Sequence, residues 1–128
     1  MSHNILVVED DPDIMRILTA TLKAAGYVVS AAYGGEEALK KVEQCRPDLI
    51  LTDLAMPEMS GVEVIEMLRR DQSNADIPIV AVTAYIWDGL AQAAGAVGCD
   101  GFIAKPFSTK HLLEEVQKYL STKTGQAS

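Results

Sequence analysis

Short apolar runs alternate with segments of helical periodicity along the whole chain. The apolar runs predict five buried strands, over residues 4–8, 28–32, 49–53, 78–83 and 101–104. Apolar positions that recur every three or four residues predict helices over 12–25, 36–45, 60–71, 85–97 and 108–120. The fourth of these helices contains Gly89 and Gly95, each of which destabilises a helix by roughly 1 kcal/mol relative to Ala.

Residues at the predicted helix ends match known capping preferences. Asp11 stands just before Pro12 and is a natural N-cap, Gly26 stops the same helix, and Ser108 caps the last one. The helical spacing predicts these inward-facing positions: Ile14, Ile17, Leu18, Thr21, Leu22, Ala25, Ala38, Leu39, Val42, Val62, Ile65, either Met67 or Leu68, Leu112, Leu113, Val116 and Leu120.

The strict alternation of strands and helices determines the fold class. Such a pattern requires a parallel sheet with right-handed crossovers, and five strands are too few for an eight-stranded barrel. We therefore predict an α/β fold, a doubly wound five-stranded parallel sheet with five helices on its two faces. A chain of 128 residues holds one domain, which we place at 1–121, and the polar segment 122–128 is expected to fray.

Composition and charge exclude several classes of function. The chain is 48% apolar, as in globular proteins, and no apolar stretch approaches the roughly 18 residues of a membrane span. Its N-terminus lacks the layout of a signal peptide, so we expect a cytoplasmic protein without a membrane partner. The net charge of −7 argues against direct binding of nucleic acid. Cys45 and Cys99 form no CxxC motif and are expected to be small buried hydrophobes.

Residues that can carry chemistry follow the strands. Glu9 and Asp10 end the first strand, Asp53 the third, Thr83 the fourth and Lys105 the fifth. Because the carboxyl ends of parallel strands share one edge of a sheet, we expect these side chains to lie close together. Asp53 is the first candidate for chemistry, although a strand-end Asp can also simply cap a turn.

This set of side chains suits phosphoryl transfer. Carboxylates packed together repel one another unless a cation lies among them, and oxygen ligands without His or Cys select Mg²⁺, for which Mn²⁺ can substitute. Asp53 would attack phosphorus and become an aspartyl phosphate, while Lys105 and Thr83 would stabilise the phosphoryl oxygens. No His or Glu is evident to activate water, so the acyl phosphate would persist long enough to be a signal.

Four motifs then give a family resemblance. LVVEDD, DLAMPEMSG, VTA and KPF, in this order, resemble the receiver domain of bacterial two-component response regulators. The spacings agree as well, with thirty residues from Asp53 to Thr83 and twenty-two from Thr83 to Lys105, and the resemblance covers about residues 4–120. It implies a flavodoxin-like sheet of strand order 2-1-3-4-5, which is not an independent deduction from spacing.

The resemblance also implies individual roles. It makes Asp53 the phosphoacceptor, Asp10 a direct Mg²⁺ ligand, Glu9 a ligand through water and the Ala55 carbonyl the last protein ligand. Lys105 would bind phosphate, with a cis bond to Pro106. Thr83 and Phe102 would be the switch residues that change the face formed by the fourth helix, fifth strand and fifth helix, although Phe102 can equally be a plain core aromatic.

A stand-alone receiver similar to chemotaxis receivers is the function that the resemblance implies. Its partners would be a histidine kinase or a histidine phosphotransfer protein and a downstream protein effector, and it would be a monomer or a weak phosphorylation-dependent dimer. It would be no enzyme beyond catalysing its own phosphorylation and dephosphorylation. Ile14, Met15 and Leu18 would help to form the phosphotransfer surface or would simply be core residues.

Some positions depart from the family pattern or leave alternatives open. Ala55 and Tyr85 occupy sites where receivers vary and where side chains control access of water to the phosphate, and Phe102 lacks the hydroxyl of a Tyr. Trp87 is a candidate anchor for a partner or a packing residue. The rival interpretations are a fragment of a hybrid kinase or transcription factor, a metal-dependent phosphatase with an Asp nucleophile, and an inert pseudo-receiver. Such phosphatases carry a second Asp where this chain has Ala55.

Overall fold

A five-stranded parallel sheet forms the centre of the protein. The computed structural model describes residues 3–84 and 89–125. The strand order is β2-β1-β3-β4-β5, and every neighbouring pair is parallel, which confirms the predicted sheet and its order. The strands are β1 (Asn4–Val8), β2 (Val28–Ala32), β3 (Leu49–Thr52), β4 (Ile79–Thr83) and β5 (Gly101–Ala104).

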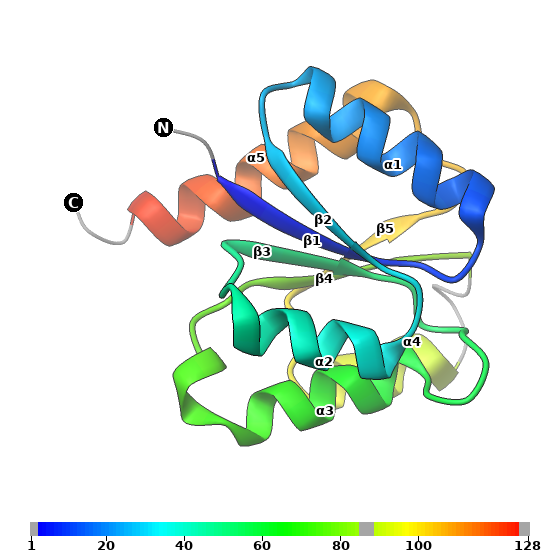
Figure 1. Ribbon diagram of the computed structural model, residues 1–128, viewed down its shortest axis with the longest axis vertical. Helices are drawn as coiled ribbons and strands as arrows, with labels where there is room; N and C mark the ends of the chain where they lie inside the picture. Colours follow the sequence, from blue (N-terminus) through cyan, green and yellow to red (C-terminus); the bar gives the residue numbers. More distant parts are fainter. Residues whose placement is uncertain (1–2, 85–88, 126–128) are drawn as a thin grey trace.

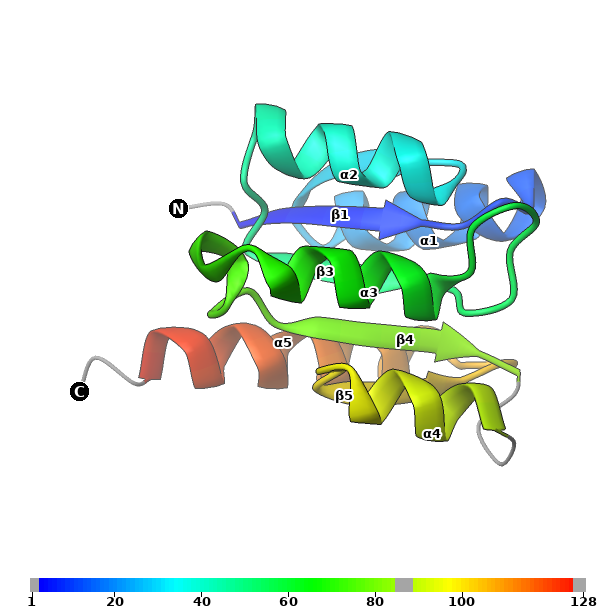
Figure 2. The ribbon, with the colours of Figure 1, turned by 90° about the horizontal axis from the view of Figure 1, so that it is seen from below.

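Helices cover both faces of the sheet, as a doubly wound fold requires. Helices α1 and α5 lie on one face, and α2, α3 and α4 lie on the other (Figures 1 and 2). Their bounds are α1 (Pro12–Ala24), α2 (Gly35–Gln44), α3 (Gly61–Arg70), α4 (Gly89–Ala96) and α5 (Thr109–Gly125), and a 3₁₀ turn, η1 (Gln72–Asn74), was not predicted. In the part of the chain that the structure describes, no helix combines the length and apolarity needed to cross a membrane.

Two of the predicted helices differ from the observed ones at their ends. The described part of the fourth helix begins at Gly89, and residues 85–88, which include Tyr85 and Trp87, lie outside the described residues. The last helix continues to Gly125, so helical structure extends into the segment that we expected to fray.

Alternation along the strands divides the core into two layers. Side chains at odd positions of β1 and β3, such as Ile5 and Leu51, pack with α1 and α5. Side chains at even positions, such as Leu6 and Ile50, pack with α2, α3 and α4. The inner strands are therefore buried on both faces, which explains why they read as continuous apolar runs in the sequence.

The prediction of inward-facing helix positions was partly wrong. Ile17 is exposed, at 56%, whereas Met15 and Val64, which were not predicted, are buried. Of the two alternatives on α3, Leu68 is the buried one and Met67 is 42% exposed. The buried stripe of α1 is formed by Met15, Leu18 and Leu22, and Ile17 stands one helical step outside it. Cys45 is also exposed, against expectation, because it is the C-cap residue of α2, where the chain leaves the helix.

Side-chain N-caps define where α1 and α5 begin after the loops that leave the sheet. The Asp11 carboxylate accepts hydrogen bonds from the N–H groups of Asp13 and Ile14 at the start of α1, at 2.9 and 3.3 Å. Ser108 accepts from the His111 N–H at 3.0 Å at the start of α5. Both predicted N-caps are thus confirmed. The cap at Asp11 directs the chain into a helix immediately after the acidic residues that end β1.

Candidate functional site

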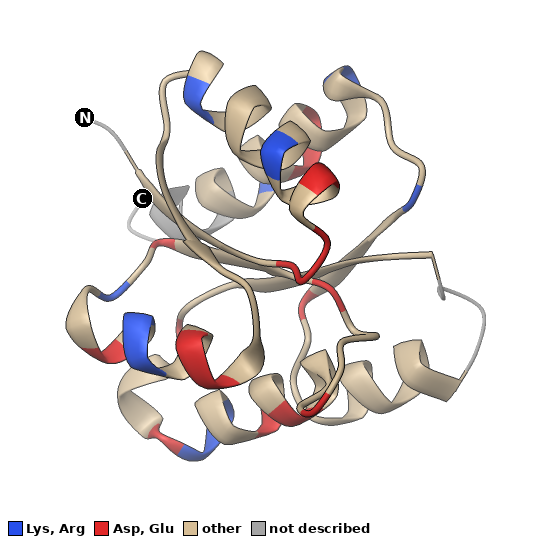
Figure 3. Ribbon diagram, turned by 45° about the vertical axis from the view of Figure 1, so that its right-hand side comes forward, with Lys and Arg blue, Asp and Glu red and all other residues tan. Residues whose placement is uncertain are grey.

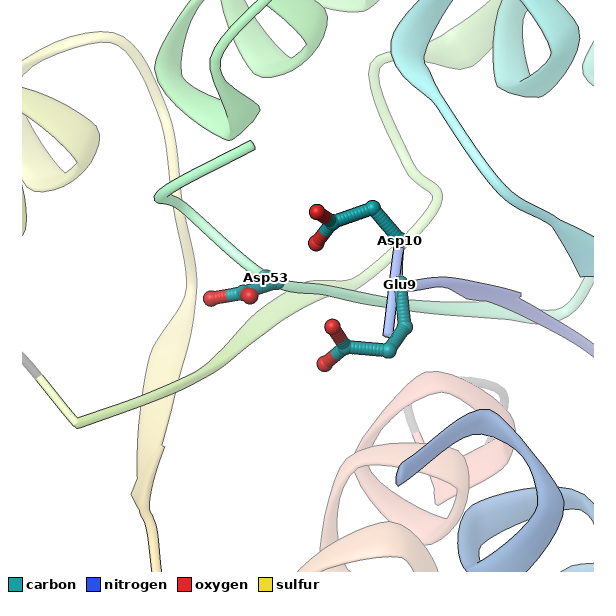
Figure 4. A group of neighbouring side chains, drawn as sticks. All are labelled: Glu9, Asp10 and Asp53. Carbon is teal, nitrogen blue, oxygen red and sulfur yellow. The ribbon is translucent and has the colours of Figure 1, made fainter. Parts of the chain in front are cut away.

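Three carboxylates converge where β1 and β3 end. These two strands are neighbours, with Val8 opposite Thr52, and the Asp53 N–H donates to the Val8 carbonyl at 2.9 Å. One carboxylate oxygen from each of Glu9, Asp10 and Asp53 lies within 4.8 Å of the other two. Figure 3 shows acidic segments meeting at this edge of the sheet, and Figure 4 shows the three side chains directed to the same side. The predicted grouping of these acids is therefore observed in the structure.

The Asp53 carboxylate is held by its own loop on one side and faces Lys105 on the other. Its Oδ1 accepts a hydrogen bond from the Leu54 N–H at 2.8 Å and a longer one from the Ala55 N–H at 3.4 Å. Its Oδ2 lies 3.3 Å from the Lys105 ammonium nitrogen. The side chain is buried, with 8% of the residue exposed. One oxygen is thus fixed in place while the other stands beside a cation, which is an orientation suited to a nucleophile.

Gly61 permits the close approach of α3 to Asp53, a contribution that the sequence analysis missed. A Cβ at this position would lie 2.0 Å from the Asp53 carbonyl oxygen, so any other residue would force the backbones apart. The Gly61 N–H donates to the Leu54 carbonyl at 2.9 Å, which closes the loop that carries Asp53. The only sequence signal was a glycine directly after the N-cap Ser60, where a side chain is usually tolerated.

Lys105 reaches the acidic group from the end of β5. Its ammonium nitrogen lies 2.7 Å from Glu9 Oε1, closer than to Asp53. The backbone N–H of Lys105 donates to the Thr83 carbonyl at 3.0 Å, and its bond to Pro106 is cis, which is the conformation that the family resemblance implied. The sequence predicted Lys105 at this site but did not predict that Glu9 is its nearest partner.

Burial shapes the ionisation of Glu9 and Lys105. Burial raises the pKa of Glu9, aided by the charge of Asp53 and opposed by hydrogen bonds from Lys105 and the Asp11 N–H. Burial by itself lowers the pKa of Lys105, but its hydrogen bond to Glu9 and the charges of Asp53 and Glu9 outweigh this and raise it. The raised pKa of Lys105 shows that the neighbouring carboxylates favour its charged form, whereas the raised pKa of Glu9 shows that burial disfavours the charged form of that carboxyl.

The donor set fits a hard divalent cation. Within the described residues, three carboxylates gather here and the Lys105 ammonium pairs with two of them, Glu9 and Asp53, so negative charge remains uncompensated at the site. All ligand atoms are oxygens, which favour Mg²⁺ or Mn²⁺ over zinc. An added divalent cation would offset the remaining charge.

The other predicted site residues lie at different distances from this centre. Thr83 is fully buried at the end of β4, the strand beside β3. Ala55 is exposed in the loop that follows Asp53. Phe102 lies in the middle of β5, opposite Ala81, and packs against the core layer of α2, α3 and α4, so it does not line the acidic site itself. Tyr85 lies outside the described residues.

The α1 residues considered for a phosphotransfer surface divide between core and surface. Met15 and Leu18 belong to the core, whereas Ile14 is only partly buried. A groove of about 360 Å³ lies beside Lys105 and is lined by Ile14, Ile17, Ala84, Lys105, Pro106 and Phe107. The exposed Ile17, predicted to be buried, thus forms part of an apolar surface next to the acidic site.

Comparison with known proteins agrees with this geometry. The family model of the response regulator receiver domain matches residues 5–117. The polar-differentiation response regulator DivK of Brucella anthropi is 36% identical over 120 residues, which cover 94% of this chain and 98% of DivK.

Two solved structures resemble the whole sheet and its helices. The chemotaxis protein CheY4 of Vibrio cholerae superimposes with a TM-score of 0.88 at 34% identity, covering 93% of this chain and 99% of CheY4. The receiver domain of the sensor histidine kinase PA1611 of Pseudomonas aeruginosa, with a magnesium ion coordinated in its active-site cleft, gives a TM-score of 0.88 at 29% identity and covers 94% of this chain and 99% of that domain.

Proposed function

The chain belongs to the response regulator receiver family of two-component signalling, and from this premise we propose that Asp53 accepts a phosphoryl group from a phosphohistidine in an Mg²⁺-dependent step. An Asp53 oxygen forms the new bond to phosphorus as the bond from phosphorus to the histidine nitrogen breaks. The electron pair of that bond returns to the imidazole, which takes up a proton. The observation that carries this proposal is the Asp53 carboxylate fixed by the Leu54 N–H and facing Lys105 at 3.3 Å.

The neighbouring residues serve the transfer in distinct ways. Asp10, Asp53 and the Ala55 carbonyl would hold Mg²⁺ directly and Glu9 would do so through water, and Mn²⁺ can take its place. When bound, the metal supplies positive charge that offsets the charge of the phosphoryl oxygens. Lys105, now shared between Glu9 and Asp53, would turn to a phosphoryl oxygen, and its flexible stem permits this movement.

Thr83 and Phe102 would convert phosphorylation into a change of surface. Thr83 ends β4 and its carbonyl binds the Lys105 N–H, so a shift at the phosphorylated site is linked to this strand. Phe102, partly buried against the α4 side of the sheet, would rotate and alter the face of α4, β5 and α5. A histidine kinase or histidine phosphotransfer protein would supply the phosphoryl group, and a downstream protein effector would bind the altered face. The cytoplasmic location and the domain limits 1–121 remain predictions.

Labelling with acetyl phosphate tests the proposal. With Mg²⁺ and ³²P-acetyl phosphate, the chain should take up label to at most one phosphoryl group per molecule, and chelation of the metal should prevent uptake. Asp53→Asn should abolish labelling because the amide is no nucleophile. Asp76→Asn is the matched control, since it removes an exposed aspartate that pairs with Arg46 away from the site.

Three outcomes would contradict the proposal. Undiminished labelling of Asp53→Asn would show that another residue accepts the phosphoryl group. Steady hydrolysis of a phosphomonoester would instead favour the phosphatase, although the position of its second aspartate holds Ala55. A chain that takes up no label with Mg²⁺ present would be a pseudo-receiver.

A further inference from the structure

Strand β2 is an outer strand of the sheet with no protection in its own sequence. Among the described strands it pairs with β1 alone (Figure 1). Its residues, Val28-Val29-Ser30-Ala31-Ala32, include no charge and no proline. Edge strands of this kind present unpaired backbone groups that readily add a further strand, and proteins normally block them with charged side chains, prolines or a covering element.

The printed hydrogen bonds show which backbone groups of β2 face outward. The Val28 N–H donates to His3 and the Ala32 carbonyl accepts from Glu9, so Val28 and Ala32 face β1. Because backbone groups alternate in direction along a strand, Ser30 also faces β1 while Val29, Ala31 and Tyr33 face away from the sheet. The outer edge of the sheet therefore consists of the N–H and carbonyl groups of these last three residues.

Helix α2 covers two of these outward groups with charged side chains. The Lys41 ammonium donates to the Ala31 carbonyl at 2.5 Å, and Glu37 Oε1 accepts from the Tyr33 N–H at 2.8 Å. Glu37 and Lys41 stand one helical turn apart, with Glu37 Oε2 and Lys41 Nζ separated by 3.7 Å. Because the Ala31 carbonyl and the Tyr33 N–H are bonded to side chains of α2, they are not available to pair with another strand.

We propose that Glu37 and Lys41 keep the β2 edge closed to a second copy of this chain. An antiparallel pair of β2 strands centred on Ser30 would set Val29 of each copy opposite Ala31 of the other. In this register Val29 of each copy and Ala31 of the other donate their N–H groups to each other's carbonyls. All four outward groups of Val29 and Ala31 then form hydrogen bonds. The register needs the two Ala31 carbonyls, which Lys41 occupies. The edge is thus self-complementary once the lysine is removed.

The surface beside the β2 edge also suits the β2 strand of a second copy. Val28 and Tyr33 are apolar residues exposed at 51% and 52%. A groove of about 410 Å³ between α1 and β2 is lined by Val29, Ala31 and Tyr33 together with Pro12, Met15, Arg16, Thr19 and Lys23. A paired β2 strand would cover the apolar part of this mixed surface, which adds to the gain from the backbone hydrogen bonds. None of this depends on phosphorylation at Asp53.

Removal of the lysine tests the proposal. Lys41→Met keeps the length of the side chain but deletes its charge and its donor, and it should strengthen self-association about tenfold or more, because the Ala31 carbonyl of each copy becomes available. Sedimentation equilibrium of the full chain measures this. Arg70→Met is the matched control. Arg70 pairs with Glu66 at the same four-residue spacing, with 3.9 Å between the charged atoms, but it lies on α3 and caps no strand in the described part of the chain. Lys41→Arg retains a donor and should stay like the unchanged chain.

A second substitution identifies the edge as the interface. Ser30 is exposed and would lie opposite its own copy at the centre of the pair, so Ser30→Lys added to Lys41→Met should abolish the association through like charges. The proposal is overturned if Lys41→Met associates no more strongly than Arg70→Met, or if Ser30→Lys does not reverse the effect. Association of the unchanged chain that Ser30→Lys abolishes would also overturn it, because the edge would then be open with the lysine in place. If Lys41→Met fails to fold, Lys41→Leu, which also lacks both charge and donor, serves in its place.

Discussion

Each end of the sheet carries a cluster of acidic and basic side chains. The two clusters differ in whether their positive and negative charges balance. At the amino ends of β4 and β5, Arg69 pairs with Asp100 at 2.8 Å and also donates to the carbonyls of Gly98 and Asn74, at 3.1 and 2.8 Å. The Asp100 carboxylate accepts in addition from the Ile79 N–H at 2.8 Å. One cation meets one anion, and the bonds of both go to groups of the protein.

The cluster at the carboxyl ends is unbalanced by comparison. Lys105 is shared by Glu9 and Asp53, and Asp10 stands within reach of both. The charges of the first cluster are balanced without any ligand. Its contacts connect α3 to the loops before β4 and β5. The second cluster retains negative charge that Lys105 alone does not offset, which suits the cation of the proposed phosphoryl transfer. Charge balance therefore separates a structural ion pair from a functional site in this fold.

Lys105→Met should give the largest effect, on phosphorylation. The variant removes the cation that would bind a phosphoryl oxygen, and loss of one such donor typically slows a reaction roughly 10²- to 10³-fold. The initial rate of labelling by acetyl phosphate with Mg²⁺ measures this. Arg69→Met provides the comparison, because it removes the other cation and should leave labelling close to that of the unchanged chain. Equal losses in the two variants would contradict the division into structural and functional clusters.

Arg69→Met should give the next largest effect, on folding stability. The side chain of Arg69 is 17% exposed, and its loss removes the cation that pairs with Asp100 and the donor to the carbonyls of Gly98 and Asn74. Loss of this ion pair, whose arginine is largely buried while its aspartate is 45% exposed, together with the hydrogen bonds to carbonyls should lower the free energy of unfolding by about 2 kcal/mol. Urea unfolding measured at one pH checks it. The exposed pair Arg16–Asp13 gives the control, since Arg16→Met should cost less than about 1 kcal/mol.

Addition of Mg²⁺ should stabilise the folded chain through the carboxyl-end cluster alone. A ligand that binds only the folded state at ten times its Kd raises the free energy of unfolding by about 1.4 kcal/mol. Thermal unfolding with and without Mg²⁺ measures the gain, which Asp10→Asn should reduce and Arg69→Met should retain. A gain that survives Asp10→Asn in full would place the cation elsewhere.

Alkaline pH should reduce the stabilisation by the Lys105 cluster and leave the stabilisation by the Arg69 cluster unchanged. The pKa of Lys105 is raised above the ordinary 10.5 by its partners Glu9 and Asp53, which outweigh burial. Its contribution to stability is therefore fully present below pH 10.5 and is lost as the pH rises through its higher folded pKa. Arginine side chains in general keep their charge to higher pH than lysine side chains do. With chelator present, the difference in unfolding free energy between the unchanged chain and Lys105→Met should shrink above pH 10.5, whereas the difference to Arg69→Met should not.

The functional cluster was the more predictable of the two from sequence. Glu9, Asp10, Asp53 and Lys105 each follow an apolar run directly, and the ends of parallel strands must share an edge. Arg69 and Asp100 are separated by 31 residues, on a helix and in a loop, and no local pattern connects them. Charged residues on an amphipathic helix usually face solvent, so nothing in the sequence distinguished Arg69 from the exposed Arg70 beside it.

Details within the functional cluster still depended on tertiary packing. The sequence predicted Lys105 near Asp53, but its shorter contact is with Glu9, because the choice between two acceptors follows from side-chain conformation and burial. The need for Gly61 beside the Asp53 carbonyl arises only from the packing of α3 on the end of β3. The register of α1 was misplaced for a similar reason, since both Met15 and Ile17 are apolar and only contact with the sheet decides which is buried.

The two ends of the sheet also differ in which residue adopts a left-handed backbone conformation. At the amino end, the φ of +111° belongs to Gly98, and a Cβ there would lie 2.9 Å from the Arg69 side chain. At the carboxyl end, a φ of +68° belongs to Glu58, in a tight turn where the Met59 N–H donates to the Pro57 carbonyl at 2.8 Å. A residue with a side chain adopts this conformation at a cost that glycine avoids, so the loop after Asp53 holds strain that the amino end does not.

Glu58→Gly should therefore give a small gain, the smallest effect of this series. Relief of the left-handed conformation stabilises the folded state, but the added freedom of the unfolded chain offsets part of it, which leaves about 0.5 kcal/mol. Gly98→Ala should show the opposite sign and a larger size, because it introduces strain and a contact with Arg69. Urea unfolding of both variants measures the pair. A loss of stability in Glu58→Gly would mean that the Glu58 side chain stabilises the loop by more than its backbone strain, and the contrast between the two ends would then rest on charge alone.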